Sequence, residues 1–233
     1  TDQALALTSL QLQALGTIQA KSLKSEQVNA LDADLIKMNT DAFAALSTDA
    51  IKNLSTSLVT SVSSTQMGAL TTDQAKQLDA SVAALLSGAQ AAAITTQDFA
   101  KLSTSVVSAL STDAVAKLTS NQINSMVQGQ VTSLQSDQIV ALTSTQTLNL
   151  ASQQAGWITD GQIQAMETGD LAKMNTLAFA NLSTDVIAAL SSDQMSKLTT
   201  AQVNSLTTSQ AKALGTLQAG ALTSSQVPAS VYR

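Results

Sequence analysis

The sequence contains no cysteine and no histidine in its 233 residues. Without cysteine there are no disulfides and no thiolate chemistry, and without histidine there are no imidazole bases and little scope for zinc or haem ligation. Serine and threonine hydroxyls are abundant, but no imidazole is present to activate one as a nucleophile. We therefore expect no catalytic residues, no cofactor and no metal site, and the protein is predicted not to be an enzyme.

Charge is sparse as well, because charged residues make up 12% of the chain and the net charge is −5. An acidic surface has no basic patch to release counterions from phosphates, so a nucleic-acid partner is not expected. The apolar runs are only a few residues long, too short for a membrane span, and no signal peptide opens the chain. Hydrophobic residues still reach 44%, so the chain is expected to fold. No small-molecule substrate is expected.

What the chain does contain is an eight-residue repeat, visible in "LTTAQVNSLTTSQAKAL" at 198–214. If the recurring leucine is position 8, that position runs from Leu7 to Leu31 and, after a one-residue deletion, from Met38 to Leu222. All 28 such residues are apolar and 21 are leucine. Position 5 is apolar almost throughout, position 4 is glutamine in 18 of 29 units, and positions 1 and 2 are mostly Thr or Ser. The consensus is Thr-Thr-Asp-Gln-Val-x-Ala-Leu.

This consensus predicts a new helix every eight residues. Thr or Ser followed three residues later by Gln is a capping box, and the apolar residues on either side form a hydrophobic staple. Aspartate at position 3 falls in the first helical turn, where it meets the positive end of the helix dipole. Such aspartates are Asp41, Asp49, Asp73, Asp113, Asp185 and Asp193.

A continuous α-helix and a β-solenoid are the two alternatives to short helices. In one continuous α-helix the apolar positions would drift by about 80° per repeat, so no single face could be buried. A β-solenoid is the stronger alternative, but positions 5 and 8 would point to opposite faces of a straight strand. Glycine (nine) and proline (one) are also scarce for its corners.

We therefore predict an all-α elongated solenoid, a superhelix of about 28 octapeptide units over residues 1–227, followed by a tail at 228–233. Each helix would have about six residues and a length near 9 Å, too short to be stable alone, so stability must come from stacking. The number of units in one superhelical turn does not follow from the sequence.

A longer repeat is superimposed on the octapeptide. "DLIKMNTDAFAALSTDAI" at 34–51 matches "DLAKMNTLAFANLSTDVI" at 170–187, and "DFAKLSTSVVSALSTDAV" at 98–115 is a looser copy. In these copies position 4 is Asp and then apolar instead of Gln. The residues are Asp34, Ala42, Ala50, Leu58, Asp98, Val106, Ala114, Asp170, Ala178 and Val186. Duplication of a better-packed module is the favoured interpretation, and a lateral contact for a partner chain is the other.

Individual residues offer weak alternatives. The Asp-containing turns suggest calcium, with Asp32 and Asp34 nearest to a cluster, but one carboxylate per unit is not the cage of oxygens that calcium requires. Trp157, the only tryptophan, is interpreted as a local packing variant. The lysines Lys52, Lys76, Lys101, Lys117, Lys173, Lys197 and Lys212 are expected to form a solvated face. The methionines Met38, Met67, Met126, Met166, Met174 and Met195 are expected in the core.

Tandem units of the form "LTTxQVxAL" resemble repeat regions of very large bacterial surface and secreted proteins of adhesin-like or haemolysin-like type. The resemblance extends from Gln3 to Val227. It implies an extracellular, acidic, cysteine-free spacer or assembly element and carries over no catalytic residue. We expect a non-enzymatic stalk, sheath or filament element, or alternatively a module that binds a peptide or glycan in the superhelix groove. Aromatic residues are only 2%, which favours the first.

The ends of the array lead to one more expectation. Solenoids normally end in polar capping repeats, but the first unit here, with Ala4 and Leu7, is as apolar as the interior ones. The sequence is therefore expected either to be a piece of a longer array or to associate head to tail with other copies. Such a heterologous contact does not close and produces fibres.

Overall fold

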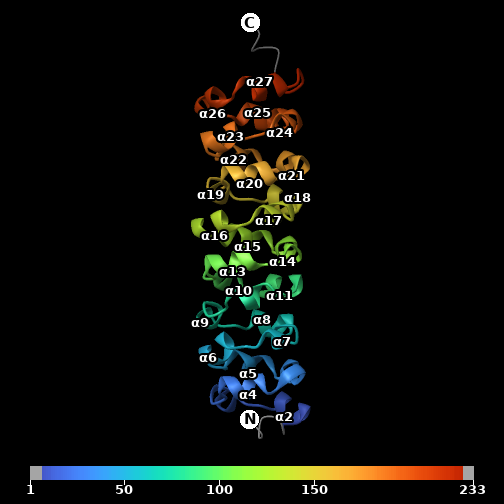
Figure 1. Cartoon of the computed structure of the whole chain (residues 1–233), viewed down its shortest axis with the longest axis vertical. Coiled ribbons are helices and arrows are strands. Elements are labelled where there is room, and N and C mark those ends of the chain that lie inside the picture. Colours follow the sequence, from blue (N-terminus) through green and yellow to red (C-terminus); the bar gives the residue numbers. More distant parts are fainter. Residues whose placement is uncertain (1–6, 228–233) are drawn as a thin grey trace. The chain divides into compact units, whose positions relative to one another are not determined.

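The computed structural model describes residues 7–227, and over this range the chain forms 26 short α-helices, one 3-10 helix and no strand (Figure 1). The predicted all-α solenoid is confirmed, and the β-solenoid alternative is wrong. Gln3, Ala4 and the predicted tail at 228–233 lie outside the described residues. No helix among residues 7–227 is long and apolar enough to cross a membrane.

The chain forms two compact units, Thr1–Leu118 and Thr119–Arg233. The first contains α2 (Ser9–Gln13), α3 (Thr17–Lys21), α4 (Ser25–Asn29), η1 (Asp32–Lys37), α5 (Thr40–Ala44), α6 (Thr48–Lys52), α7 (Thr56–Val59), α8 (Ser64–Gly68), α9 (Thr72–Ala75), α10 (Ala80–Ala83), α11 (Gly88–Ala93), α12 (Thr96–Phe99), α13 (Thr104–Ala109) and α14 (Thr112–Lys117). The second contains α15 (Ser120–Ser125), α16 (Gln128–Ser133), α17 (Ser136–Val140), α18 (Ser144–Leu148), α19 (Ser152–Ala155), α20 (Asp160–Ala165), α21 (Thr168–Lys173), α22 (Thr176–Ala180), α23 (Thr184–Ala188), α24 (Ser192–Lys197), α25 (Thr200–Ser205), α26 (Thr208–Ala213) and α27 (Thr216–Ala221). Continuity of one solenoid over 1–227 stays a prediction.

Within each unit the helices stack in columns, because each helix packs against the third one along the chain. In the first unit the columns are α3, α5, α8, α11 and α14; α4, α6, α9 and α12; and α2, η1, α7, α10 and α13. In the second they are α17, α20, α23 and α26; α15, α18, α21, α24 and α27; and α19, α22 and α25. One superhelical turn therefore contains three octapeptides, the number that the sequence left open.

The helices begin where the capping boxes predict. Thr199 has an extended backbone (ψ 154°), its hydroxyl accepts from the Gln202 N–H at 3.2 Å, and its own N–H donates to Gln202 Oε1 at 2.9 Å. Ten such N-cap residues make both bonds: Thr8, Ser63, Thr71, Ser87, Thr119, Thr143, Thr159, Ser191, Thr199 and Thr207. At Gly16, Lys24, Val127, Gln135 and Gly215 the glutamine alone accepts the N-cap N–H.

All three columns turn positions 4, 5 and 8 inward, so each unit has a continuous core. The phenylalanines at position 5, Phe43, Phe99 and Phe179, are fully buried. All six methionines are buried too, as the spacing predicted. Glycine allows a close backbone approach at one point of the stack: a Cβ on Gly68 would lie 2.8 Å from the Ala93 carbonyl oxygen in the next turn.

The one-residue deletion breaks the capping scheme. Leu31 has to serve both as the buried end of one unit and as the residue before the next helix, and its backbone is helical rather than extended. Asp32 then takes a positive φ of 45°, a conformation that Asp tolerates better than most residues. The unit forms η1, a 3-10 helix, and still buries Leu35 and Met38. The prediction of a capped α-helix in every unit is wrong here, because seven residues leave none for an extended N-cap.

Candidate functional site

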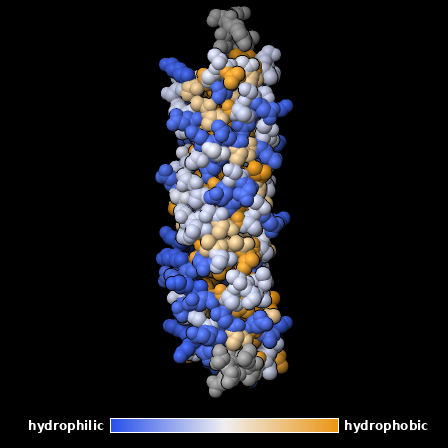
Figure 2. All heavy atoms as spheres, in the orientation of Figure 1, coloured by the Kyte–Doolittle hydropathy of each residue, from blue (hydrophilic) through white to orange (hydrophobic). Residues whose placement is uncertain are grey.

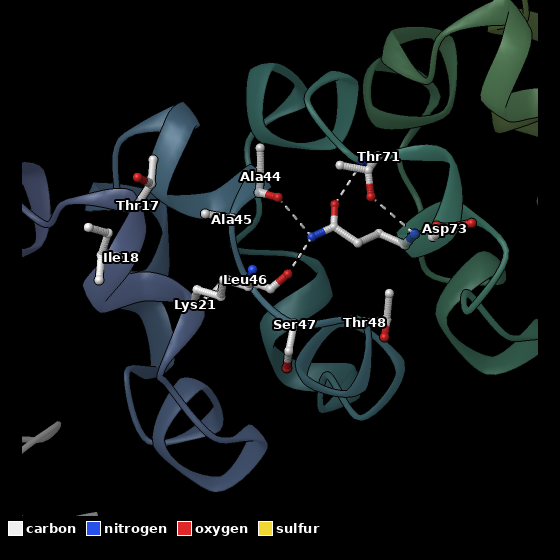
Figure 3. Close-up of a pocket in the computed structure, with 11 residues that line it drawn as sticks. Thr17, Ile18, Lys21, Ala44, Ala45, Leu46, Ser47, Thr48, Thr71 and Asp73 are labelled. Atoms are coloured by element: carbon white, nitrogen blue, oxygen red, sulfur yellow. Dashed lines mark hydrogen bonds between the residues drawn. The ribbon is translucent and has the colours of Figure 1, made fainter.

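The most elaborate polar feature of the protein lies between stacked turns, and its central residue is the position-4 glutamine. In Gln74, Oε1 accepts the Thr71 N–H at 2.7 Å, which is the capping bond. Its Nε2 donates to the carbonyls of Ala44 at 3.1 Å and Leu46 at 2.7 Å, both in the preceding turn (Figure 3). One side chain thus starts its own helix and ties it to the end of another.

The same cross-turn bonds recur through both units. Glutamine Nε2 donates to two backbone carbonyls 28 and 30 or 31 residues earlier at Gln66, Gln74, Gln90, Gln154, Gln162, Gln194, Gln202, Gln210, Gln218 and Gln226. Most of these side chains are buried, with Gln202 only 1% exposed. No buried side-chain nitrogen or oxygen among the described residues lacks a hydrogen-bond partner. Burying an amide costs folding free energy unless its N–H and C=O groups are all hydrogen-bonded. The paired glutamines therefore favour this one register between successive turns.

Sequence reasoning explained these glutamines only as capping residues and missed their cross-turn bonds. A signal was available: a capping box accepts Glu as readily as Gln, yet position 4 is never Glu in this chain. Glutamate supplies the acceptor oxygen but no N–H donors. The absence of glutamate at position 4 therefore indicates that the side-chain N–H groups of glutamine make hydrogen bonds of their own.

Asparagine performs the same task in two of the units where position 4 is alanine. Asn175 Oδ1 accepts the Ala178 N–H at 2.9 Å, and its Nδ2 donates to the carbonyls of Leu148 and Leu150 in the preceding turn. Asn39 is bonded in the same way ahead of Ala42. We call the pair of cross-turn bonds from one amide a clamp. In these two units the residue that supplies both the capping bond and the clamp is at position 1 instead of position 4.

The apolar residues at position 4 face inward. Ala42, Ala50, Leu58, Val106, Ala114, Ala178 and Val186 are at most 1% exposed. A partner chain cannot reach these side chains, so any lateral contact at this module would have to use its exposed residues, and the lateral-contact interpretation stays a prediction. Their burial supports the other interpretation, a module with a wider apolar core.

Several acidic side chains also bond across turns. The hydroxyl of Ser25 donates to Asp49 at 2.7 Å, Thr72 donates to Asp98, and Ser144 donates to Asp170. In each case a position-2 hydroxyl contacts a carboxylate of the next helix in its column. These acidic residues thus contribute to stacking, and Asp49 also lies in the first helical turn as predicted.

No group of three or more acidic side chains in residues 7–227 could hold a metal ion. Asp32 and Asp34, the nearest to a cluster by sequence, lie on η1 and are both exposed. Asp79, the exposed N-cap of α10, accepts from the Ser81 hydroxyl and the Val82 N–H, and these bonds hold its pKa below the ordinary value.

The predicted lysine face is exposed at all seven positions, and Lys76 pairs with Asp73 at 3.2 Å. Trp157 is half-buried. On the face shown in Figure 2, hydrophilic residues are interspersed with separate apolar spots. The most exposed large apolar residues are Ile18, Leu217, Leu10 and Leu177, at 72% to 86%. All four occupy position 3, where the consensus has aspartate.

The first unit also has an open hollow of about 740 Å³ between two helix columns. Figure 3 shows Ile18 and Lys21 of α3 on one side and Asp73 of α9 on the other, with Ser47 between them. The hollow is lined by four apolar residues, one cation, one carboxylate, one amide and several hydroxyls.

Comparison with protein families supports the repeat. Residues 91–127 and 163–200 match the ALTTAQ repeat. The protein is therefore a tandem repeat protein, and "LTTAQ" itself stands at 198–202. Each matched stretch contains position-8 residues that end one helix and position-1 residues that cap the next. No curated protein matches the chain.

Proposed function

We propose that the protein is a non-enzymatic structural element of the cell surface or extracellular space, a stalk, sheath or filament component assembled by stacking of turns, including end to end. The cross-turn glutamine bonds are the observation that carries this proposal. They hold one turn to the next, and they recur in both units.

The polar chemistry of the chain supports a mechanical role. Each helix has only four to six residues and depends on its neighbours, so stability is shared among turns in the manner of a solenoid. Clamps at Gln66, Gln74 and Gln90 and the hydroxyl–carboxylate bonds at Asp49 and Asp98 all join successive turns of the first unit. Separating two turns would expose a buried amide, two carbonyls and core leucines together.

The extracellular location is supported by the resemblance of the "LTTxQVxAL" units to bacterial surface and secreted repeat proteins. Antibody raised against the folded chain should label intact cells of the producing organism. A cytosolic enzyme serves as the internal control and should be labelled only after permeabilisation. Labelling of the repeat protein only after permeabilisation would refute the surface location.

A second candidate is a binding module, favoured by the hollow beside Ile18, Lys21 and Asp73. An Ile18→Arg variant should lose a peptide or glycan bound there, because Ile18 lines the hollow. The variant should still fold, because Ile18 is 86% exposed and is not part of the core. Glycan and peptide arrays probed with both chains test this. Equal binding by the variant, or no bound ligand on either array, would remove this candidate.

A further inference from the structure

One junction inside the first unit has no amide clamp. It joins the turn of α9, α10 and α11 to the next turn, which contains α12, α13 and α14. The position-4 residues of the later turn are Asp98, Val106 and Ala114, and none of them carries an amide. The carbonyls that a position-4 glutamine would reach, 28 residues earlier, accept no hydrogen bond from any described residue; they belong to Leu70, Leu78 and Leu86.

The helices of the later turn nevertheless keep their caps. The hydroxyls of Thr95, Ser103 and Ser111 accept the position-4 N–H groups of α12, α13 and α14. A hydroxyl has one hydrogen to donate, so it cannot bond to two carbonyls as an amide does. Each helix therefore begins as the repeat predicts, but no amide joins it to the turn before.

Apolar side chains fill this junction instead. The fully buried ones on the later turn are Phe99, Val106, Val107, Ala114 and Val115. Two hydrogen bonds join the described residues of these two turns: the Thr72 hydroxyl donates to Asp98, and the Gly88 N–H donates to Asp113 at 3.2 Å. These bonds lie in the columns of α9 and α12 and of α11 and α14, and none lies between α10 and α13.

Hydrogen bonds are directional, whereas apolar contact is not. A full set of clamps therefore fixes the register of two turns, and apolar packing with two bonds leaves it adjustable. We propose that this junction, which we call the apolar joint, is a flexible hinge inside the first unit. It pivots on the two bonded columns, and the movement is largest between α10 and α13. A stack of turns can then bend at one defined place without separating, wherever in the cell the protein acts.

The second unit contains a fully clamped counterpart. Gln194, Gln202 and Gln210 each donate to two carbonyls of the preceding turn. There α21, α24 and α27 stack in one column, as α7, α10 and α13 do in the first unit. Both columns offer exposed position-3 residues two turns apart, which are Ser57 and Ser105 in the first unit and Gly169 and Leu217 in the second.

These residues allow a direct comparison of the two junctions. The chain has no cysteine, so introduced cysteine pairs can be spin-labelled without background. S57C/S105C spans the apolar joint and G169C/L217C spans the clamped turns, and a Cβ at Gly169 meets no atom within 4 Å. Each pair should be separated by roughly 20 Å, because stacked helices lie about 8–10 Å apart. Double electron–electron resonance should give a distance distribution about twice as wide for S57C/S105C, and equal widths would overturn the hinge.

A clamp-restoring variant isolates the cause. D98Q, V106Q and A114Q together give the apolar joint the residue that position 4 has in most other units. The triple variant should narrow the S57C/S105C distribution to the width of the clamped pair and leave G169C/L217C unchanged. A triple variant that keeps its helical circular dichroism but not a narrower distribution would overturn the proposal. If the three substitutions prevent folding, the comparison of the two cysteine pairs in the otherwise unchanged chain still decides it.

Discussion

Replacing Gln202 by alanine should destabilise the second unit more than any capping effect can explain. The side chain is 1% exposed, and it accepts the Thr199 N–H at 2.9 Å. It also donates to the carbonyls of Leu171 at 2.8 Å and Met174 at 2.9 Å. Alanine leaves the Thr199 N–H and the Met174 carbonyl without a partner, whereas the Leu171 carbonyl still accepts the Met174 N–H at 3.1 Å. Each buried orphan costs roughly 1–3 kcal/mol, so the expected loss is about 2 kcal/mol or more.

The chain contains a matched control for this experiment. Gln11 makes the same capping bond, to the Thr8 N–H at 2.8 Å, but no cross-turn bond with any described residue. Because Gln11 is exposed, Gln11→Ala should cost only about 0.5–1 kcal/mol. The difference between the two variants measures the clamp alone.

A second substitution separates the clamp from the cap by pH. Gln202→Glu keeps the capping acceptor but sets a carboxylate against two carbonyls, which raises the pKa of that carboxyl in the folded state. A raised folded pKa means that stability is fully present below the unfolded value near 4.3 and is lost as pH rises through the folded pKa. The variant should therefore be most stable in acid, relative to the parent chain.

Denaturant unfolding and native-state hydrogen exchange of the α25 amides are the appropriate assays, because a solenoid can open in parts. The parent chain and both alanine variants are compared under one condition. If Gln202→Ala costs no more than Gln11→Ala, the cross-turn bonds contribute nothing and the reasoning is refuted.

Other substitutions test single features by the same unfolding assay. Thr199→Ala should cost about 1 kcal/mol and Thr200→Ala clearly less; the reverse order would move the helix start by one residue. Asn175→Asp should lose stability although it keeps the cap, because its two cross-turn donors disappear; an unchanged midpoint would contradict this. Gly68→Ala should cost about 1–3 kcal/mol from the 2.8 Å approach to Ala93, and a neutral result would show that the stack yields easily. Adding EGTA should change Tm little; a fall of more than about 10 °C would reveal a calcium site, since one kcal/mol shifts Tm by roughly 2–4 °C.

Helix starts and core positions were predictable because both depend on local chemistry. Thr199 and Gln202 lie in one octapeptide, and the bonds that define the helix start connect residues three apart. The alternation of polar and apolar residues likewise identified Phe43 and Met195 as core. The deletion after Leu31 was visible, but its result, a 3-10 helix with a positive φ at Asp32, was not.

The number of octapeptides in a turn was not predictable, since it depends on the angle between successive helices. That angle is set where an extended position-8 residue such as Leu198 (ψ 145°) meets the extended N-cap Thr199 (ψ 154°). A difference of a few degrees at each joint accumulates over a turn, and the octapeptide pattern does not reveal this angle. The number of octapeptides in a turn is seen only from bonds between residues 24 to 31 apart, as in those of Asn175 and Gln202.

Those distant partners also explain the longer repeat. In the two closest copies, Asn39 precedes Ala42 and Asn175 precedes Ala178, so an amide at position 1 accompanies a small apolar residue at position 4. Either the glutamine or the asparagine can supply both the cap and the clamp, and a unit that uses asparagine is free to bury an apolar side chain at position 4. The looser copy has Ser103 before Val106, which caps the helix but cannot donate two amide hydrogens to the turn before it. In the two closest copies, one unit therefore exchanges a polar residue at position 4 for a polar residue at position 1 as the means of joining turns. The apolar position-4 residues of the copies are buried, so they contribute to the core of their own unit.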